Sequence, residues 1–157
     1  MGERYLKSIR LLAECMQGFE RLSSERARQS GLTHPQFDII ATLGNTPGMS
    51  YKELGEKTLI TKGTLTGVID RLEQKGLVER QRNDCDKRSF FVRLTADGEA
   101  TFNAAFPKMM EMGRTLFTDY REEDLAALEK NLSRLKTVIM ASHPGCPSTP
   151  DSTKENI

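Results

Sequence analysis

The fold is decided by residues 50–95, which read SYKELGEKTLITKGTLTGVIDRLEQKGLVERQRNDCDKRSFFVRLT. Ser50 is followed three residues later by Glu53, the spacing of a capping box, in which side chains and backbone N–H groups pair at a helix N-terminus. This spacing predicts a short helix of about two turns that ends near Lys57. A second helix is expected to begin after Thr61 as its N-cap and to end at Gly76.

The second of these helices is one-sided. Its apolar residues follow the i, i+3, i+4, i+7 pattern that buries one face of a helix: Leu65, Val68, Ile69 and Leu72. Its other face presents small or hydrogen-bonding residues in place of the Glu/Lys mixture of an ordinary solvated helix: Lys62, Thr64, Thr66, Asp70, Arg71 and Gln74. A face of this kind could enter a groove of DNA.

After Gly76 the hydrophobic period changes from 3.6 to two, which predicts two strands of a hairpin at 78–82 and 90–94. Between them, residues 83–88 are polar and turn-prone and are expected to form a projecting tip. A short helix, a turn, a one-sided helix and a hairpin in this order are typical of a winged helix-turn-helix, whose second helix lies in a major groove. The region 50–95 has ten Lys/Arg and seven Asp/Glu, so its net charge of +3 exceeds the +1 of the whole chain.

Helices are expected on both sides of this region. A helix over about 3–29 has apolar residues at steps of four and three from Tyr5 to Phe19. The next helix begins at Thr33, with Gln36 as its capping-box partner. Two further helices are predicted within 96–141, the first capped by Thr95 and the second covering about 122–141, and the Pro-rich residues 142–157 are predicted to be a disordered tail.

Two of these helices have apolar seams that one small domain cannot easily bury, which predicts a homodimer. The seam residues expected at the interface are Ile9, Leu12, Leu125, Leu128, Leu132 and Leu135. The fold class is therefore mainly α with a small β-hairpin wing: a winged helix-turn-helix at about 33–95 plus a helical dimerisation region (about 3–29 and 96–141), in one domain over 1–141.

Composition excludes several classes of protein. With 157 residues, 37% hydrophobic and 29% charged, the chain is typical of one soluble globular domain, and no apolar run is long enough to span a membrane. Three cysteines without framework spacing indicate a reducing cytoplasm. The two histidines, both beside prolines, make a catalytic triad or a metal site improbable. We therefore expect no enzyme, no metal and no cofactor.

The sequence also resembles a known family. The matching stretches are Gly31-Leu32-Thr33 with Gln36, Leu54-Gly55-Glu56, 62–66 (KGTLT), 70–73 (DRLE), 75–80 (KGLVER), 86–88 (DKR), and Leu94-Thr95 with Gly98. In this order and spacing they resemble the MarR family of bacterial transcription regulators, over about residues 5–141. The resemblance implies a homodimer that binds pseudo-palindromic double-stranded DNA, probes it with the recognition helix and the wing, and is often released by a small ligand or by oxidation.

The resemblance assigns DNA contacts to individual residues. Lys62, Thr64 and Thr66 would lie in the major groove, and Arg88, oriented by Asp86, would enter the minor groove from the wing. Asp70 and Arg71 would either contact DNA or pair within the protein. Many relatives have a long basic residue where this chain has Gly67, so one contact to a phosphate or a base would be missing.

The regulatory signal has two candidate sources. A small aromatic or apolar acid would fit a pocket between the dimerisation helices and the winged domain, lined by Met16, Phe37, Phe102, Phe106 and Met109. The alternative is a redox-responsive regulator that uses Cys15, although a small core or interface residue is the simpler interpretation of this cysteine; Cys85 and Cys146 are expected to be incidental. A further alternative is a winged-helix interaction module that does not bind DNA.

Overall fold

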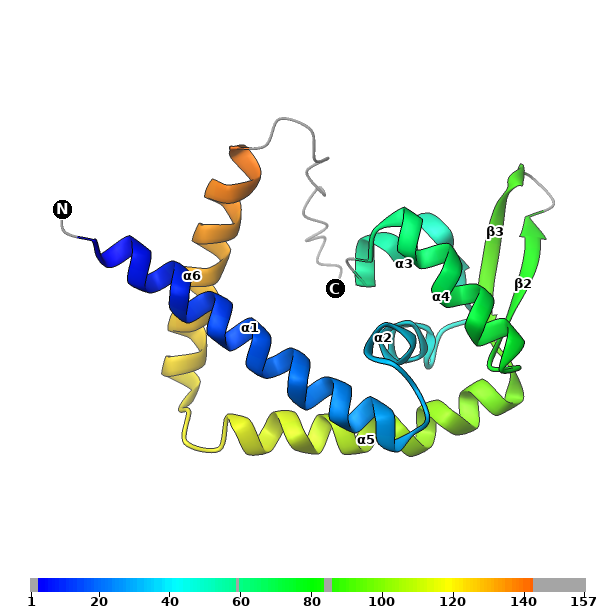
Figure 1. Ribbon diagram of the computed structural model, residues 1–157, viewed down its shortest axis with the longest axis horizontal. Coiled ribbons are helices and arrows are strands. Elements are labelled where there is room, and N and C mark those ends of the chain that lie inside the picture. The colour runs from blue at the N-terminus through cyan, green and yellow to red at the C-terminus, as the bar shows by residue number, and fades with distance from the viewer. Residues whose placement is uncertain (1–2, 59, 84–85, 143–157) are drawn as a thin grey trace, which may run out of the picture. The chain divides into compact units, whose positions relative to one another are not determined.

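The computed structural model describes residues 3–58, 60–83 and 86–142 and is mainly helical with one small sheet (Figure 1). The elements in chain order are α1 (Arg4–Gln29), α2 (His34–Leu43), β1 (Met49–Ser50), α3 (Tyr51–Thr58), α4 (Lys62–Gln74), β2 (Val78–Asn83), β3 (Asp86–Leu94), α5 (Ala96–Leu116) and α6 (Glu122–Ala141). The chain divides into two compact units, Met1–Gly113 and Arg114–Ile157. The predicted fold class is confirmed, whereas the assignment of 1–141 to one domain stays a prediction and residues 143–157 of the predicted tail lie outside the described residues.

The predicted helix starts at Thr33 and Ser50 are confirmed. At α2, the backbone N–H of Gln36 donates to Thr33 Oγ1 at 3.4 Å and the Thr33 N–H donates to Gln36 Oε1 at 3.1 Å. At α3, the Ser50 N–H donates to Glu53 Oε2 at 2.8 Å and the Glu53 N–H donates to Ser50 Oγ at 3.2 Å. The hydrogen bonds that the N–H and the hydroxyl of Ser50 donate to the Glu53 carboxylate lower the pKa of Glu53.

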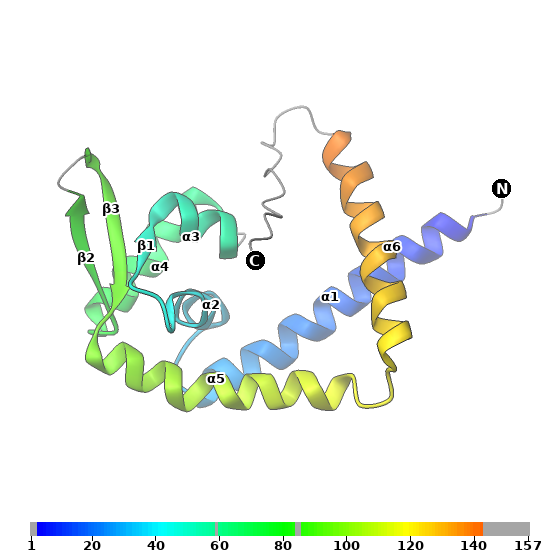
Figure 2. The ribbon, with the colours of Figure 1, turned by 180° about the vertical axis from the view of Figure 1, so that it is seen from behind.

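The sheet has three strands where the sequence predicted two. β2 and β3 form the expected antiparallel hairpin, from Val78↔Leu94 to Arg82↔Phe90. The strands also continue into the expected tip, since Asn83 pairs with Asp86 after a register shift. β1 adds to the other edge of β3, in the order β1-β3-β2, and was not predicted because two residues are too short to show a period (Figure 2).

One hydrophobic core joins the sheet to α2, α3 and α4. Its fully buried large side chains are Ile39, Ile40, Leu43, Leu54, Leu65, Ile69, Leu72, Val78 and Val92. The four residues of the predicted apolar side of α4 are all in this core. Their burial turns the opposite side of α4 outward, and the β2–β3 hairpin stands beside α4 and points away from α5 (Figure 1).

The first turn of α5 and the end of α2 approach other elements through glycines. A Cβ on Gly98 would overlap the Leu77 carbonyl, and a Cβ on Gly44 would overlap the ring of Phe102, which is buried. Both glycines therefore allow α5 to lie directly against the winged helix-turn-helix. Gly98 of α5 approaches the backbone of Leu77, and Gly44 after α2 approaches the ring of Phe102 on α5.

The apolar seams of α1 and α6 are only partly covered in the described chain. On α1, Ile9 is 60% exposed and Leu12 is half-buried; on α6, Leu132 is 44% exposed and Leu125 is half-buried. Leu128 and Leu135 are also exposed. Four of these six seam residues are therefore exposed in the described chain, and the homodimer stays a prediction.

Replacement of Gly44 by Ala tests the contact with Phe102. We expect Gly44→Ala to lower the free energy of unfolding by about 1–3 kcal/mol, because the added methyl group forces the buried ring to shift. Gly18→Ala is the matched control, since its Cβ meets nothing within 4 Å in α1, and it should raise stability by about 0.5–1 kcal/mol. Denaturant unfolding measures both, and equal effects of the two substitutions would contradict the contact.

Candidate nucleic-acid interface

The outward side of α4 contains the recognition residues that the sequence predicted. Lys62, Thr64, Thr66 and Arg71 are all exposed, on the side opposite the buried leucines. Gly63 and Gly67 lie between them, and a Cβ at either position would meet nothing within 4 Å. The helix therefore exposes two hydroxyls and two cations on either side of Gly63 and Gly67, where the backbone has no side chain.

The start of α4 differs from the prediction in one detail. Thr61 is the N-cap residue, as expected, but its side chain accepts no hydrogen bond from the helix backbone. Its hydroxyl donates instead to Thr64 Oγ1 at 3.2 Å. Because Thr64 accepts in this pair, its own hydroxyl proton remains able to donate to a base or a phosphate.

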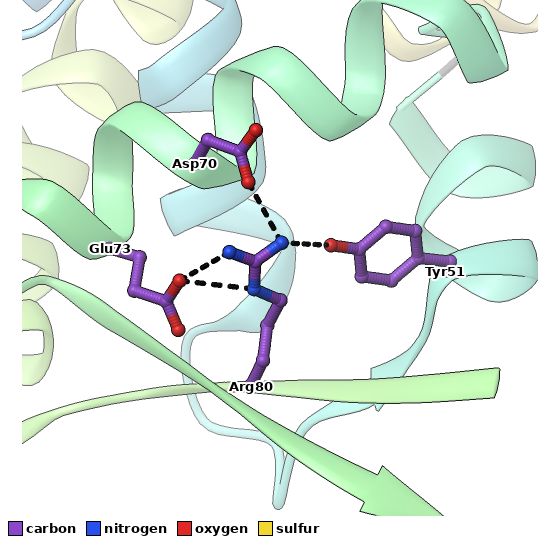
Figure 3. A network of polar contacts seen from close by, with 4 residues as sticks. All are labelled: Tyr51, Asp70, Glu73 and Arg80. Carbon is purple, nitrogen blue, oxygen red and sulfur yellow. Dashed lines mark hydrogen bonds and ion pairs between the residues drawn. The ribbon is translucent and has the colours of Figure 1, made fainter. Parts of the chain in front are cut away.

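Arg80 on β2 is a residue whose role the sequence analysis missed (Figure 3). Its guanidinium forms an ion pair with Asp70 at 2.8 Å, a second ion pair with Glu73, and a hydrogen bond to Tyr51 Oη at 3.3 Å. It also lies over the ring of Phe90, 5.9 Å from the centroid. One side chain thus connects α3, α4 and both strands of the hairpin.

The Arg80 network is electrostatically strong for a site near the surface. The Arg80 side chain is only 25% exposed, and a planar guanidinium can satisfy several acceptors at once. Hydrogen bonding to Arg80 lowers the pKa of Glu73, and hydrogen bonding to Glu73 raises the pKa of Arg80. Both shifts favour the charged forms of the two groups.

This network bears on Asp70 and Arg71, for which the sequence left open contact with DNA or pairing within the protein. Asp70 pairs with Arg80 across the helix–strand contact, and no ion pair of Arg71 is found in the described part of the chain. Arg71 therefore remains available on the exposed side of α4. The signal that could have identified Arg80 is its place on β2, seven residues after Glu73 and just beyond the Gly76 turn.

A second set of polar contacts holds the C-terminus of α4. Lys75 Nζ donates to the Gly31 carbonyl at 2.7 Å and to Gln36 Oε1 at 3.1 Å. Gln36 is buried and is itself half of the α2 capping box. The C-terminus of α4 is thereby fixed to the turn between α1 and α2.

The predicted wing contacts are placed only in part. Asp86 and Arg88 belong to β3, near the end of the hairpin, but their side chains lie outside the described structure. The predicted orientation of Arg88 by Asp86 therefore stays a prediction. Cys85 and Cys146 also lie outside the described residues, while Cys15 is an exposed free cysteine on α1.

The predicted ligand residues are not all in one place. Phe37 and Phe102 are core residues, and Phe106 and Met109 pack against the same core; the rings of Phe102 and Phe106 stack at 4.9 Å. Met16, by contrast, is 61% exposed on α1 and outside this cluster, so the structure brings together four of the five. The sequence pattern could not separate an apolar residue that faces the core from one that faces solvent on a long helix.

Comparison with known proteins identifies the family. The model of the MarR family matches residues 32–90, the region from the α2 cap to β3. The HTH-type transcriptional regulator YsmB of Bacillus subtilis is 31% identical over 130 residues, which cover 83% of this chain and 87% of that protein. The chain belongs to the MarR family. No helix in the described ranges of this MarR-family protein is long and apolar enough to cross a membrane.

Two further relatives indicate the kind of regulator. The homoprotocatechuate degradative operon repressor of Escherichia coli is 30% identical over 101 residues, 64% of this chain and 68% of the repressor. The crystal structure of NadR in complex with 4-hydroxyphenylacetate superimposes with a TM-score of 0.67 and 26% identity, covering 79% of this chain and 88% of NadR. The relatives are thus transcriptional regulators, not enzymes.

Proposed function

We propose that this MarR-family protein is a homodimeric, sequence-specific DNA-binding regulator that represses transcription until a small aromatic acid binds. The main support is the geometry of α4, which buries one side in the core and exposes hydroxyls and cations on the other, directly before a hairpin. This is the arrangement of a winged helix whose second helix enters a major groove.

The contacts follow from where each residue lies. Thr64 and Thr66 offer hydroxyls to base edges, while Lys62 and Arg71 reach phosphates or guanines from the two flanks of α4. Two copies of α4 about 34 Å apart would lie one helical turn from each other, which favours a pseudo-palindromic site. Arg88, oriented by Asp86, would then enter a flanking minor groove, where A·T-rich sequence attracts an arginine.

The dimer would be formed by the helices on either side of the winged helix-turn-helix. The exposed seams of α1 and α6 need a partner, and a second copy of the same chain provides matching seams from Ile9, Leu12, Leu125, Leu128, Leu132 and Leu135. In this proposal residues 1–141 act as one domain of a cytoplasmic protein, with 142–157 outside it.

The ligand proposal rests on the relatives together with the aromatic cluster. One relative is named for homoprotocatechuate degradation, and NadR is seen with 4-hydroxyphenylacetate, so an aromatic acid is the favoured class. The cluster of Phe37, Phe102, Phe106 and Met109 provides the apolar wall, and Met16 would join it from the dimerisation helices. Oxidation of the exposed Cys15 is the competing signal.

DNA binding is tested with operator fragments that the purified protein selects from genomic DNA. We expect Arg88→Ala to weaken binding by about 1–3 kcal/mol. The slope of the logarithm of the binding constant against the logarithm of the salt concentration should become smaller in magnitude by roughly one, and the preference for A·T-rich flanks should decrease. Lys108→Ala, an exposed lysine on α5, is the control and should leave binding unchanged. Failure to select any DNA would contradict the proposed function and favour a module that does not bind DNA.

The dimer is tested by sedimentation equilibrium. Leu132→Ala should weaken the dimer by about 2–5 kcal/mol if the dimer buries this leucine. Lys130→Ala, an exposed residue of the same helix, should have no effect. A folded monomer of the unmodified protein at micromolar concentration would rule the dimer out.

The signal is tested on the protein–operator complex. We expect 4-hydroxyphenylacetate to release DNA, which requires it to favour the released conformation by a few kcal/mol. Phe106→Ala should raise the concentration needed. Release by peroxide that Cys15→Ser abolishes, with no effect of aromatic acids, would favour the redox alternative.

A further inference from the structure

The recognition helix has an electrostatic conflict along one of its sides. Lys62, Thr66, Asp70 and Glu73 are spaced by four, four and three residues, so they form one row along α4. The first two are proposed DNA contacts, whereas the last two are carboxylates, which phosphates repel. Asp70 and Glu73 keep 44% and 38% of their side chains exposed, so burial does not remove their charge from this surface.

Arg80 is placed to resolve this conflict. Its guanidinium contacts both carboxylates at once, with one ion pair to Asp70 at 2.8 Å and another to Glu73 (Figure 3). The network reduces the charge of the row's end from −2 to −1, close to the position where DNA would approach. Carboxylates without a partner there would repel phosphates that come within a Debye length, about 8–10 Å at physiological salt.

The guanidinium is also held in place from its other side. Tyr51 accepts a hydrogen bond from it at 3.3 Å, and the ring of Phe90 lies beneath it. Tyr51 and Phe90 are themselves neighbours, with ring centroids 6.0 Å apart. Arg80 is thus fixed between α3 and the hairpin and directed at α4, unlike an exposed arginine that is free to bind a phosphate.

We propose that Arg80 is a positioning residue for DNA recognition: it offsets part of the negative charge of Asp70 and Glu73 so that α4 can approach the phosphates, without itself contacting DNA. This inference rests on the proposed DNA-binding function. It differs from a purely structural tie, in which Arg80 would only join β2 to α4 and the charge of its partners would not matter.

The two roles predict opposite effects of the same substitution. In Asp70→Asn/Glu73→Gln the carboxylates are neutral and Arg80 loses its ion pairs. If Arg80 acts by neutralisation, this variant binds the operator at least as tightly as the unmodified protein, because two repulsive charges are gone. If Arg80 is only a tie, the variant binds more weakly.

The experiment measures operator affinity at several salt concentrations, together with thermal unfolding. We expect Arg80→Met to weaken binding by roughly tenfold at low salt and by less at high salt, because like-charge repulsion is screened. The triple variant Arg80→Met/Asp70→Asn/Glu73→Gln should regain affinity to within about threefold of the unmodified protein, a coupling that independent sites would not show. Arg80→Lys keeps the charge and should bind more tightly than Arg80→Met.

Arg93→Met is the matched control. Arg93 pairs with Glu79 across β2 and β3, so its removal breaks an ion pair of the wing without exposing a carboxylate on α4. It should not reproduce the salt-dependent loss. If it does, the effect belongs to the wing and not to α4.

The outcomes are distinguishable. If the unmodified protein binds no DNA, the proposed function fails. If it binds, then unchanged affinity of a folded Arg80→Met, or no recovery in the triple variant, overturns the role of Arg80. Should Arg80→Met not fold, Asp70→Asn/Glu73→Gln still decides, since weaker binding by this folded variant overturns the proposal.

Discussion

The burial of one side of α4 is the constraint on which the rest of the structure depends. Leu65, Val68, Ile69 and Leu72 pack into the core shared by α2, α3 and the sheet. Burial of one side of the helix leaves the opposite side exposed, so it fixes which residues face outward. Those residues are the proposed DNA contacts. A rotation of α4 would move Thr64 and Thr66 and would also expose leucines, so recognition geometry and core stability are the same requirement.

Polar contacts add to packing in the C-terminal half of α4, a helix of 13 residues. Lys75, directly after the helix, attaches it to the α1–α2 turn, and Arg80 attaches Asp70 and Glu73 to α3 and the hairpin. Both ties are made by cations whose partners lie on other elements, so each depends on the complete tertiary fold. A helix held in this way can present its exposed side without reorganising when DNA binds.

The apolar residues of α1 and α6 differ from those of α4 in their exposure. In α1 and α6 the apolar residues are as regularly spaced as in α4, yet most of them remain exposed. The same pattern thus has two meanings, core within one chain or a seam that needs a second surface, and the difference lies in whether another element of the chain is present to cover it. For α1 and α6 we propose the second meaning, a seam that a second copy of the chain covers.

The sequence by itself determined the helices, the capping boxes at Thr33 and Ser50, the hairpin and the side of α4 that faces outward, because capping boxes and hydrophobic periods are local signals. It also placed Lys62, Thr64, Thr66 and Arg71 correctly on that side. Only the tertiary structure decided that β1 adds to the sheet, that Thr61 pairs with Thr64, that Met16 lies outside the aromatic cluster, and that Arg80 joins Asp70, Glu73 and Tyr51. These features depend on residues distant in the chain or on the choice among competing hydrogen-bond partners, and neither leaves a period or a spacing that a single sequence can show.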